Sequence, residues 1–235
     1  MTRAITIDAR FNGPPDSGNG GYVCGVIASQ IEGPAVVTLR TPPPLDRRLT
    51  LESTGQSVVL RDGATVVGHA ASEPLELDVP AAPSFEQAMA ARERFPARER
   101  HAFPTCFVCG PGRPGHDGME IFPGPVDADG TVASAWLPDD SMPNHEGRIR
   151  DEIAWAALDC TSYFPHYPTL ALLGRMHAQV FEAPRTGERY VVAGWSIGQE
   201  GRKHWSGSAM FDRSGKLLAM ARATWIELRQ GVEGA

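Results

Sequence analysis

One pattern of apolar runs occurs twice in the chain, and it limits the possible folds more than any other feature. Residues 57–77 and 208–228 align without gaps: each has an apolar run, a polar turn with glycine, a second apolar run and a closing Glu-Leu. This pattern predicts a β-hairpin in both places. Upstream, residues 36–51 and 177–192 share a second pattern of strand, proline- or glycine-rich turn and strand. The chain is therefore expected to contain two units of similar construction.

A candidate helix precedes these strands in each half. Residues 20–31 are small and apolar, and residues 152–164 contain the unbroken apolar run IAWAAL. A helix that is apolar all round has to be buried on every side. One further strand is expected before each helix, at residues 5–11 and 131–137. An antiparallel sheet wrapped around each helix would bury it, so the sequence predicts the α+β class.

Residues 81–105 are proline-flanked and charged, and they are expected to link the halves. Within them Ser84 is followed three residues later by Gln87, a capping box that predicts the start of a short surface helix. The expected organisation is a first unit at residues 1–80, this linker, and a second unit at residues 106–230.

The composition is that of an ordinary globular protein that can bury a core, with 235 residues, 42% hydrophobic and 21% charged. A formal net charge of −6 argues against non-specific binding to nucleic acid or to anionic membranes. No apolar run approaches the roughly 20 residues of a membrane span, and the first residues do not resemble a signal peptide. Four cysteines do not make a disulfide scaffold. We therefore expect a cytoplasmic protein without nucleic-acid or membrane partners.

The second candidate helix carries an acid that its apolar character does not explain. Asp159 follows the apolar run directly, and burying an ionised carboxylate without partners is costly. One interpretation is that Asp159 is functional. The other is that a neighbouring hydroxyl, of Thr161 or Ser162, satisfies a purely structural carboxylate. The residues alone leave both open.

The second half resembles the hotdog-fold acyl-CoA thioesterases of the phenylacetate-pathway type. The resemblance lies in CFVCG at 106–110 with GMEIF at 118–122, in AALDC at 156–160, and in the final hairpin at 200–225. The first half resembles the family more weakly, through NGGY and its hairpin. The resemblance implies a double hotdog, in which two hotdog units in one chain mimic the family's usual dimer.

In that family the central helix begins with His-Gly-Gly, whose glycine amides polarise the thioester carbonyl. An acidic residue of the other unit, seven positions after the second glycine of its own helix, acts as base or nucleophile. The first half of this chain has Asn19, Gly20 and Gly21 at the helix start, with asparagine in place of histidine. It has Ala28 in place of the acid.

The second half departs from the family pattern in the opposite way. It has Arg150, Asp151 and Glu152 where the glycines would be, and it keeps the acid as Asp159. The resemblance therefore implies one composite site between the halves, with Asp159 from the second unit and the glycine amides from the first. A helix N-terminus suits a developing oxyanion, and desolvation of the acid would raise its pKa.

Three further residues are candidates for substrate binding. Asn19 could contact the ligand or cap the helix, and its residue type favours the cap. Arg202 and Lys203 could bind the phosphates of coenzyme A, or they could form a solvated turn. The residues do not decide between these last two interpretations.

Cys106 and Cys109 have the spacing of zinc ligands, with His101 and His116 as possible third and fourth ligands. A single such pair is a weak motif, and the family resemblance accounts for it without metal. Cys24 and Cys160 are expected to be small apolar packing residues. We therefore expect no metal and no cofactor.

The function expected from these observations is hydrolysis of an acyl-CoA, or a related acyl thioester, at one composite site. The alternative is a non-catalytic acyl-CoA- or lipid-binding protein on the same scaffold, because one helix start is degenerate and fold does not imply function. The hydratase branch of the hotdog fold ranks last, because no histidine stands near Asp159 in sequence. A homodimer of double-hotdog chains is plausible.

Overall fold

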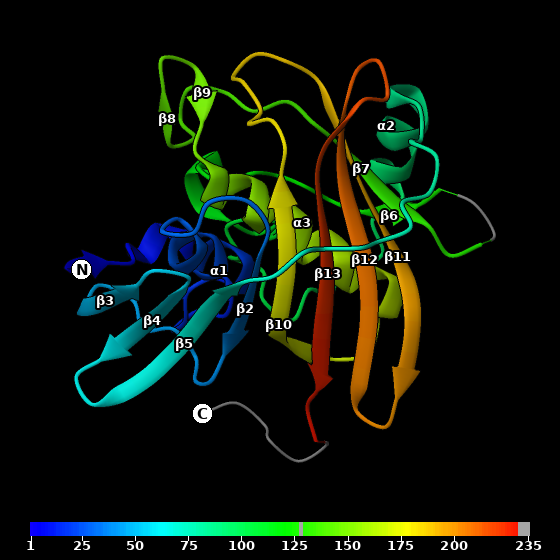
Figure 1. The fold of residues 1–235 in the computed structure, drawn as a ribbon. Coiled ribbons are helices and arrows are strands. Elements are labelled where there is room, and N and C mark those ends of the chain that lie inside the picture. Colours follow the sequence, from blue (N-terminus) through cyan, green and yellow to red (C-terminus); the bar gives the residue numbers. More distant parts are fainter. Residues whose placement is uncertain (127–128, 230–235) are drawn as a thin grey trace.

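The computed structural model describes residues 1–126 and 129–229, and one long antiparallel sheet dominates it (Figure 1). The first half contributes five strands: β1 (Thr2–Thr6), β2 (Ala35–Leu39), β3 (Arg48–Thr54), β4 (Ser57–Asp62) and β5 (Thr65–Ser72). The second half contributes six: β6 (Gly124–Pro125), β7 (Val132–Trp136), β10 (Ala171–Val180), β11 (Tyr190–Glu200), β12 (Lys203–Asp212) and β13 (Leu217–Glu227). A small separate ribbon pairs β8 (Asn144–His145) with β9 (Arg148–Ile149).

The strand order shows that the two halves are built alike. The order is β1-β3-β4-β5-β2 in the first half, and it continues as β10-β13-β12-β11-β7-β6 in the second. The two halves have the same strand order when it is followed outward from the junction between β2 and β10. Strands β2, β5, β4, β3 and β1 correspond in this order to β10, β13, β12, β11 and β7. At the junction Ala35 pairs with Ala178 and Thr38 with Arg175. The two predicted hairpins are present as β4–β5 and β12–β13.

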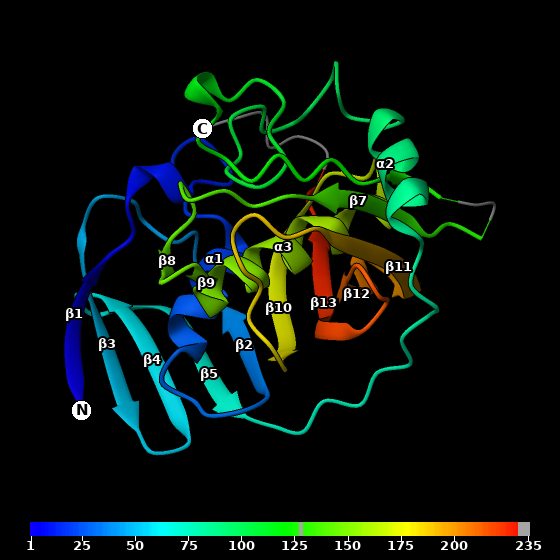
Figure 2. The ribbon, with the colours of Figure 1, turned by 90° about the horizontal axis from the view of Figure 1, so that it is seen from above.

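The sheet curves around two central helices, as Figure 2 shows from above. These are α1 (Gly20–Ala28) and α3 (Asp151–Tyr163), and most of their side chains are buried. Helix α1 ends three residues before the predicted Ile31. The chain then turns at Gly33, which has a positive φ of 82°, and enters β2. No helix among the described residues is long and apolar enough to span a membrane.

The segment between the halves contains the predicted short helix, α2 (Phe85–Glu93), which packs against β7 (Figures 1 and 2). The capping box is formed: the Gln87 backbone N–H donates to the Ser84 hydroxyl, and the Gln87 side chain accepts from the Ser84 backbone. Three short 3-10 helices complete the described elements: η1 (Ala9–Phe11), η2 (Pro114–His116) and η3 (Phe164–His166).

The CFVCG segment of the second half packs on the first half. The Phe107 backbone N–H donates to the Asn12 carbonyl at 2.8 Å. The Phe107 ring is fully buried and makes edge contacts with Phe11 and Tyr22, which stack on each other. These contacts bring residues 106–110 to the place where α1 and α3 meet.

Candidate functional site between the two central helices

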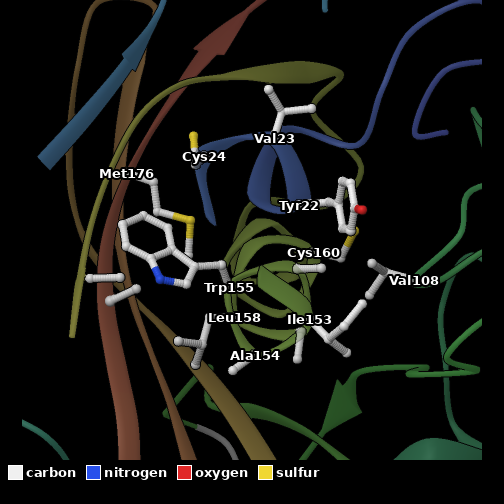
Figure 3. Packing of buried hydrophobic residues seen from close by; sticks show 14 of the residues in the cluster. Tyr22, Val23, Cys24, Val108, Ile153, Ala154, Trp155, Leu158, Cys160 and Met176 are labelled. Atoms are coloured by element: carbon white, nitrogen blue, oxygen red, sulfur yellow. The ribbon is translucent and has the colours of Figure 1, made fainter. Parts of the chain in front are cut away.

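Helices α1 and α3 approach closely because two glycines of α1 face α3. A Cβ at Gly21 would overlap the Cβ of Asp159, and a Cβ at Gly25 would lie 2.5 Å from the Cα of Glu152. Residues four apart lie on one face of a helix, so these glycines form a continuous contact surface. Figure 3 shows the start of α1 packed on α3, with Tyr22 and Cys160 on the side toward Val108.

The close approach joins Asp159 to the start of α1. Its Oδ2 accepts a hydrogen bond from the Gly21 backbone N–H at 2.8 Å and another from the Asn19 Nδ2 at 3.2 Å. The Asn19 Oδ1 accepts from the Tyr22 backbone N–H at 2.9 Å, so Asn19 is the N-cap of α1, as its residue type favoured. Asn19 therefore caps one helix and holds the acid of the other.

The neighbouring hydroxyls do not satisfy the carboxylate. Thr161 donates to the Ala157 carbonyl at 2.8 Å, and Ser162 donates to the backbone carbonyl of Asp159 at 2.7 Å. Thr161 and Ser162 are therefore not the partners of the Asp159 carboxylate, as the structural interpretation of this acid had assumed. The partners that hold Asp159 come from the other half of the chain.

The carboxyl group of Asp159 lies in a strongly desolvated place. The residue is 2% exposed, and its Oδ1 has no hydrogen-bond partner among the described residues. Burial raises its pKa from 3.8 to about 7, while the hydrogen bonds from Gly21 and Asn19 oppose this shift. A carboxyl group with such a pKa can accept a proton near neutral pH.

The two glycines at the start of α1 differ in their surroundings. Gly20 is half-buried and packs against Leu173, and no described residue accepts a hydrogen bond from its backbone N–H. The Gly21 N–H is already bonded to Asp159. Among the described residues the Gly20 amide is thus an unused donor, one residue before the amide that binds the acid.

The corresponding start of α3 is filled by side chains. Arg150 and Glu152 form an ion pair with 2.5 Å between the Arg150 guanidinium nitrogen and the Glu152 carboxylate oxygen. Glu152 is only 4% exposed. Asp151, in contrast, is exposed and lies 3.6 Å from Arg148. The start of α3 thus has a charged ion pair where α1 has glycines, and no side chain caps it.

Arg202 and Lys203 lie elsewhere in the fold. They occupy the turn and the first residue of β12, and both are exposed. The Arg202 guanidinium donates to the Glu227 carbonyl at 3.1 Å. Among the described residues, neither is hydrogen-bonded or ion-paired to Asn19, Gly20, Gly21 or Asp159.

Cysteines form a group beside Asp159 that the sequence analysis did not recognise. Cys106 and Cys109 are joined by Cys160 of α3, and all three are buried. The sequence showed the first two as a pair. Cys160 could have been assigned to the group only if the sequence had shown that it faces the start of α1, as its neighbour Asp159 does. The proposed third ligand His101 is not part of the group, and the side chain of His116 lies outside those described.

A separate cavity of about 520 Å³ lies between α2 and β7. Its wall combines apolar side chains with two cationic ones and with the carboxylates of Glu120 and Asp139. The lining includes Met89, Met119, Trp136, Arg92 and Arg189. Asp159 and the start of α1 do not line it.

The fold of the whole chain is similar to that of several solved structures. No protein-family model and no curated protein matches the chain. Among solved structures, the tesB protein of Mycobacterium avium subsp. paratuberculosis matches 97% of this chain and 93% of its own, with a TM-score of 0.63 and 12% identity. The chain has the double hotdog fold.

Two further structures agree over similar lengths. A conserved protein of unknown function with a hot dog fold, from Alicyclobacillus acidocaldarius, covers 97% of this chain and 93% of its own, with a TM-score of 0.63 and 14% identity. The acyl-CoA thioesterase II of Mycobacterium marinum covers 93% of this chain and 92% of its own, with a TM-score of 0.57 and 12% identity. In the double hotdog described above, α1 and α3 are the central helices of the two units.

Proposed function

We propose that this double hotdog chain hydrolyses an acyl-CoA thioester at one site shared by its two units. The observation that carries the proposal is the 2.8 Å hydrogen bond between the Asp159 carboxylate of α3 and the Gly21 amide of α1. It puts a desolvated acid against the N-terminus of a helix from the opposite unit. A base and oxyanion donors within hydrogen-bond reach are what thioester hydrolysis requires.

The residues have separate roles in this proposal. Asp159 takes the proton of a water molecule that attacks the carbonyl carbon, or attacks it directly as a nucleophile. The Gly20 amide, and the Gly21 amide once it is released from Asp159, stabilise the oxyanion with the positive end of the helix dipole. The carbon–sulfur bond then breaks and the thiolate leaves. In the nucleophilic route this leaves a mixed anhydride on Asp159, which water hydrolyses to the carboxylic acid and the free aspartate. Asn19 holds the carboxylate in place throughout.

The substrate class rests on resemblance and on chemistry. The sequence motifs resemble acyl-CoA thioesterases, and one matched structure is described as an acyl-CoA thioesterase II. Arg202 and Lys203 remain candidate contacts for the phosphates of coenzyme A, because both are exposed cations on one turn.

The test is the release of free coenzyme A by the purified chain from a panel of acyl-CoA esters of increasing acyl length. The proposal predicts turnover of at least one ester well above the uncatalysed rate. Absence of turnover across short, long and aromatic acyl groups would overturn it.

A second candidate function, binding without catalysis, is favoured by the cavity of about 520 Å³ between α2 and β7. Its methionine and aromatic lining suits an acyl or aromatic group, and Arg189 suits an anionic end. Arg92 is already paired with the Glu120 carboxylate at 3.4 Å. This candidate predicts that an acyl-CoA raises the Tm without being hydrolysed, because ligand binding to the folded state stabilises it. Substituting Arg189 with alanine would then remove the Tm shift.

A further inference from the structure

The three buried cysteines beside α3 have the geometry of a mononuclear metal site. The Cys106 and Cys109 sulfurs are 3.6 Å apart, and the Cys106 and Cys160 sulfurs are 3.8 Å apart. All three sulfurs lie within 4.8 Å of one another. Tetrahedral zinc with Zn–S bonds of about 2.3 Å separates its sulfurs by about 3.8 Å. A disulfide requires about 2.05 Å, so the sulfurs are not bonded to one another, and their spacing fits ligands around one ion.

The turn that carries Cys106 and Cys109 is closed by a glycine. The Gly110 backbone N–H donates to the Cys106 carbonyl at 3.0 Å. A Cβ at Gly110 would lie 2.5 Å from both the Cys106 nitrogen and the Pro104 carbonyl oxygen, so no larger residue fits. This tight turn points two sulfurs in one direction, toward Cys160 of α3.

Several N–H groups point at the sulfurs. The backbone N–H groups of Val108 and Cys109 donate hydrogen bonds to the Cys106 sulfur. The Asn19 Nδ2 lies 3.6 Å from the Cys160 sulfur and 4.0 Å from the Cys106 sulfur. Donors in this arrangement stabilise thiolates, which are the metal-binding form of cysteine.

We propose that Cys106, Cys109 and Cys160 bind one Zn²⁺ ion as thiolates. Thiolates are soft ligands that select zinc over the harder magnesium and calcium. No fourth histidine, cysteine or acidic ligand atom from the described residues joins the three sulfurs within 4.8 Å. Three thiolates and a dication already carry one net negative charge in a buried place, which disfavours a fourth anionic ligand. Neutral water therefore takes the fourth position.

The ion would join two segments of the second half, one of which packs on the first half. It would link the CFVCG segment, which is hydrogen-bonded to Asn12 of the first half, to helix α3 of the second. The inference does not rest on the proposed hydrolysis, because zinc content can be measured without any substrate.

The direct test is the metal content of the purified full-length chain by inductively coupled plasma mass spectrometry. We expect one zinc per chain, and in the chelated chain reloaded with Co²⁺ the sulfur-to-metal charge-transfer and visible bands of tetrahedral thiolate cobalt. Chelation should lower the Tm and added Zn²⁺ should restore it. A chain that contains no zinc and gives no such cobalt spectrum would overturn the proposal, and so would stoichiometric copper or iron in place of zinc.

Substitutions assign the ligands. Cys109→Ser and Cys160→Ser should each lower the zinc content to well below one per chain. Cys24→Ser is the matched control, because Cys24 is equally buried on α1 but lies outside the group, and it should keep the full zinc content. Equal zinc in all three variants would refute these ligands. If a ligand variant fails to fold, the zinc and cobalt measurements on the wild-type chain decide alone.

Discussion

At the scale of single residues, Gly21 has two requirements to meet. Its amide donates to Asp159, and its lack of a side chain lets α1 touch α3. The sequence predicted the amide from the family resemblance, but it could not show the packing requirement. The atoms that a Cβ would meet belong to Trp155 and Asp159, which are far away in the chain and become neighbours only in the fold. A loss of activity in a Gly21 variant would therefore not by itself demonstrate an oxyanion role.

The packing role predicts the effect of a small substitution. Gly21→Ala should lower the free energy of unfolding by about 1–3 kcal/mol, the usual cost of overpacking a core. Urea unfolding followed by tryptophan fluorescence measures the change. Gly198→Ala is the control, because its Cβ would meet only a Trp205 carbon at 3.9 Å, and its effect should be small. Equal effects of the two substitutions would contradict the packing argument.

At the scale of elements, the local patterns were predictable and the long-range contacts were not. The hairpins, the two buried helices and the capping box at Ser84 follow from periodicity and from residues three or four apart. The packing of Phe107 on Phe11 and Tyr22 does not, because no local pattern encodes a contact between the halves. The same reason explains why Cys160 was taken for a packing residue: its neighbours lie on the CFVCG segment.

The contact between η3 and β12 makes the stability of the protein dependent on pH. The His166 and His204 rings lie 4.9 Å apart, with the Glu227 carboxylate 3.4 Å from His204. Burial lowers the pKa of His166 from 6.5 to about 4, with the charge of His204 adding to the shift and a backbone hydrogen bond with Trp205 opposing it. Folding therefore favours the neutral ring, because the unfolded chain binds a proton more readily.

The sign follows from proton binding. Between pH 6.5 and about 4 the unfolded state holds more protons on His166, so stability is full above this range and falls as the pH drops through it. Between about pH 7 and pH 5 the Tm of the wild type should fall more than the Tm of His166→Gln. The difference between the two falls should be about 2–4 °C, which corresponds to roughly 1 kcal/mol for a protein of this length. The value of about 1 kcal/mol allows for the partial exposure of the His166 ring. Differential scanning calorimetry measures it. The exposed His145→Gln is the control, and identical pH profiles for the wild type and His166→Gln would refute the prediction.

At the scale of the whole molecule, two units share one sheet, and each unit contributes a different part of the candidate site. One central helix starts with Gly20 and Gly21, and the other carries Asp159 and starts with the Arg150–Glu152 ion pair. The sequence predicted this division because the motifs of each half could be compared position by position. It also predicted a desolvated acid that meets the glycine amides, and Asp159 is 2% exposed. It did not predict that the Gly21 amide would already donate a hydrogen bond to the carboxylate in the free protein. That depends on how closely the two helices pack, which no single sequence pattern specifies.

The site shared by the two units is tested by the kcat of Asp159→Asn on the acyl-CoA ester that the wild type hydrolyses fastest. Asparagine can still accept the Gly21 hydrogen bond, so the fold should be kept while the base is removed. We expect a loss of about 10²- to 10⁴-fold in kcat, the usual contribution of a general base. Asp151→Asn, an exposed acid of the same helix, should retain wild-type kcat. A folded Asp159→Asn variant with a kcat close to that of the wild type would contradict the shared site.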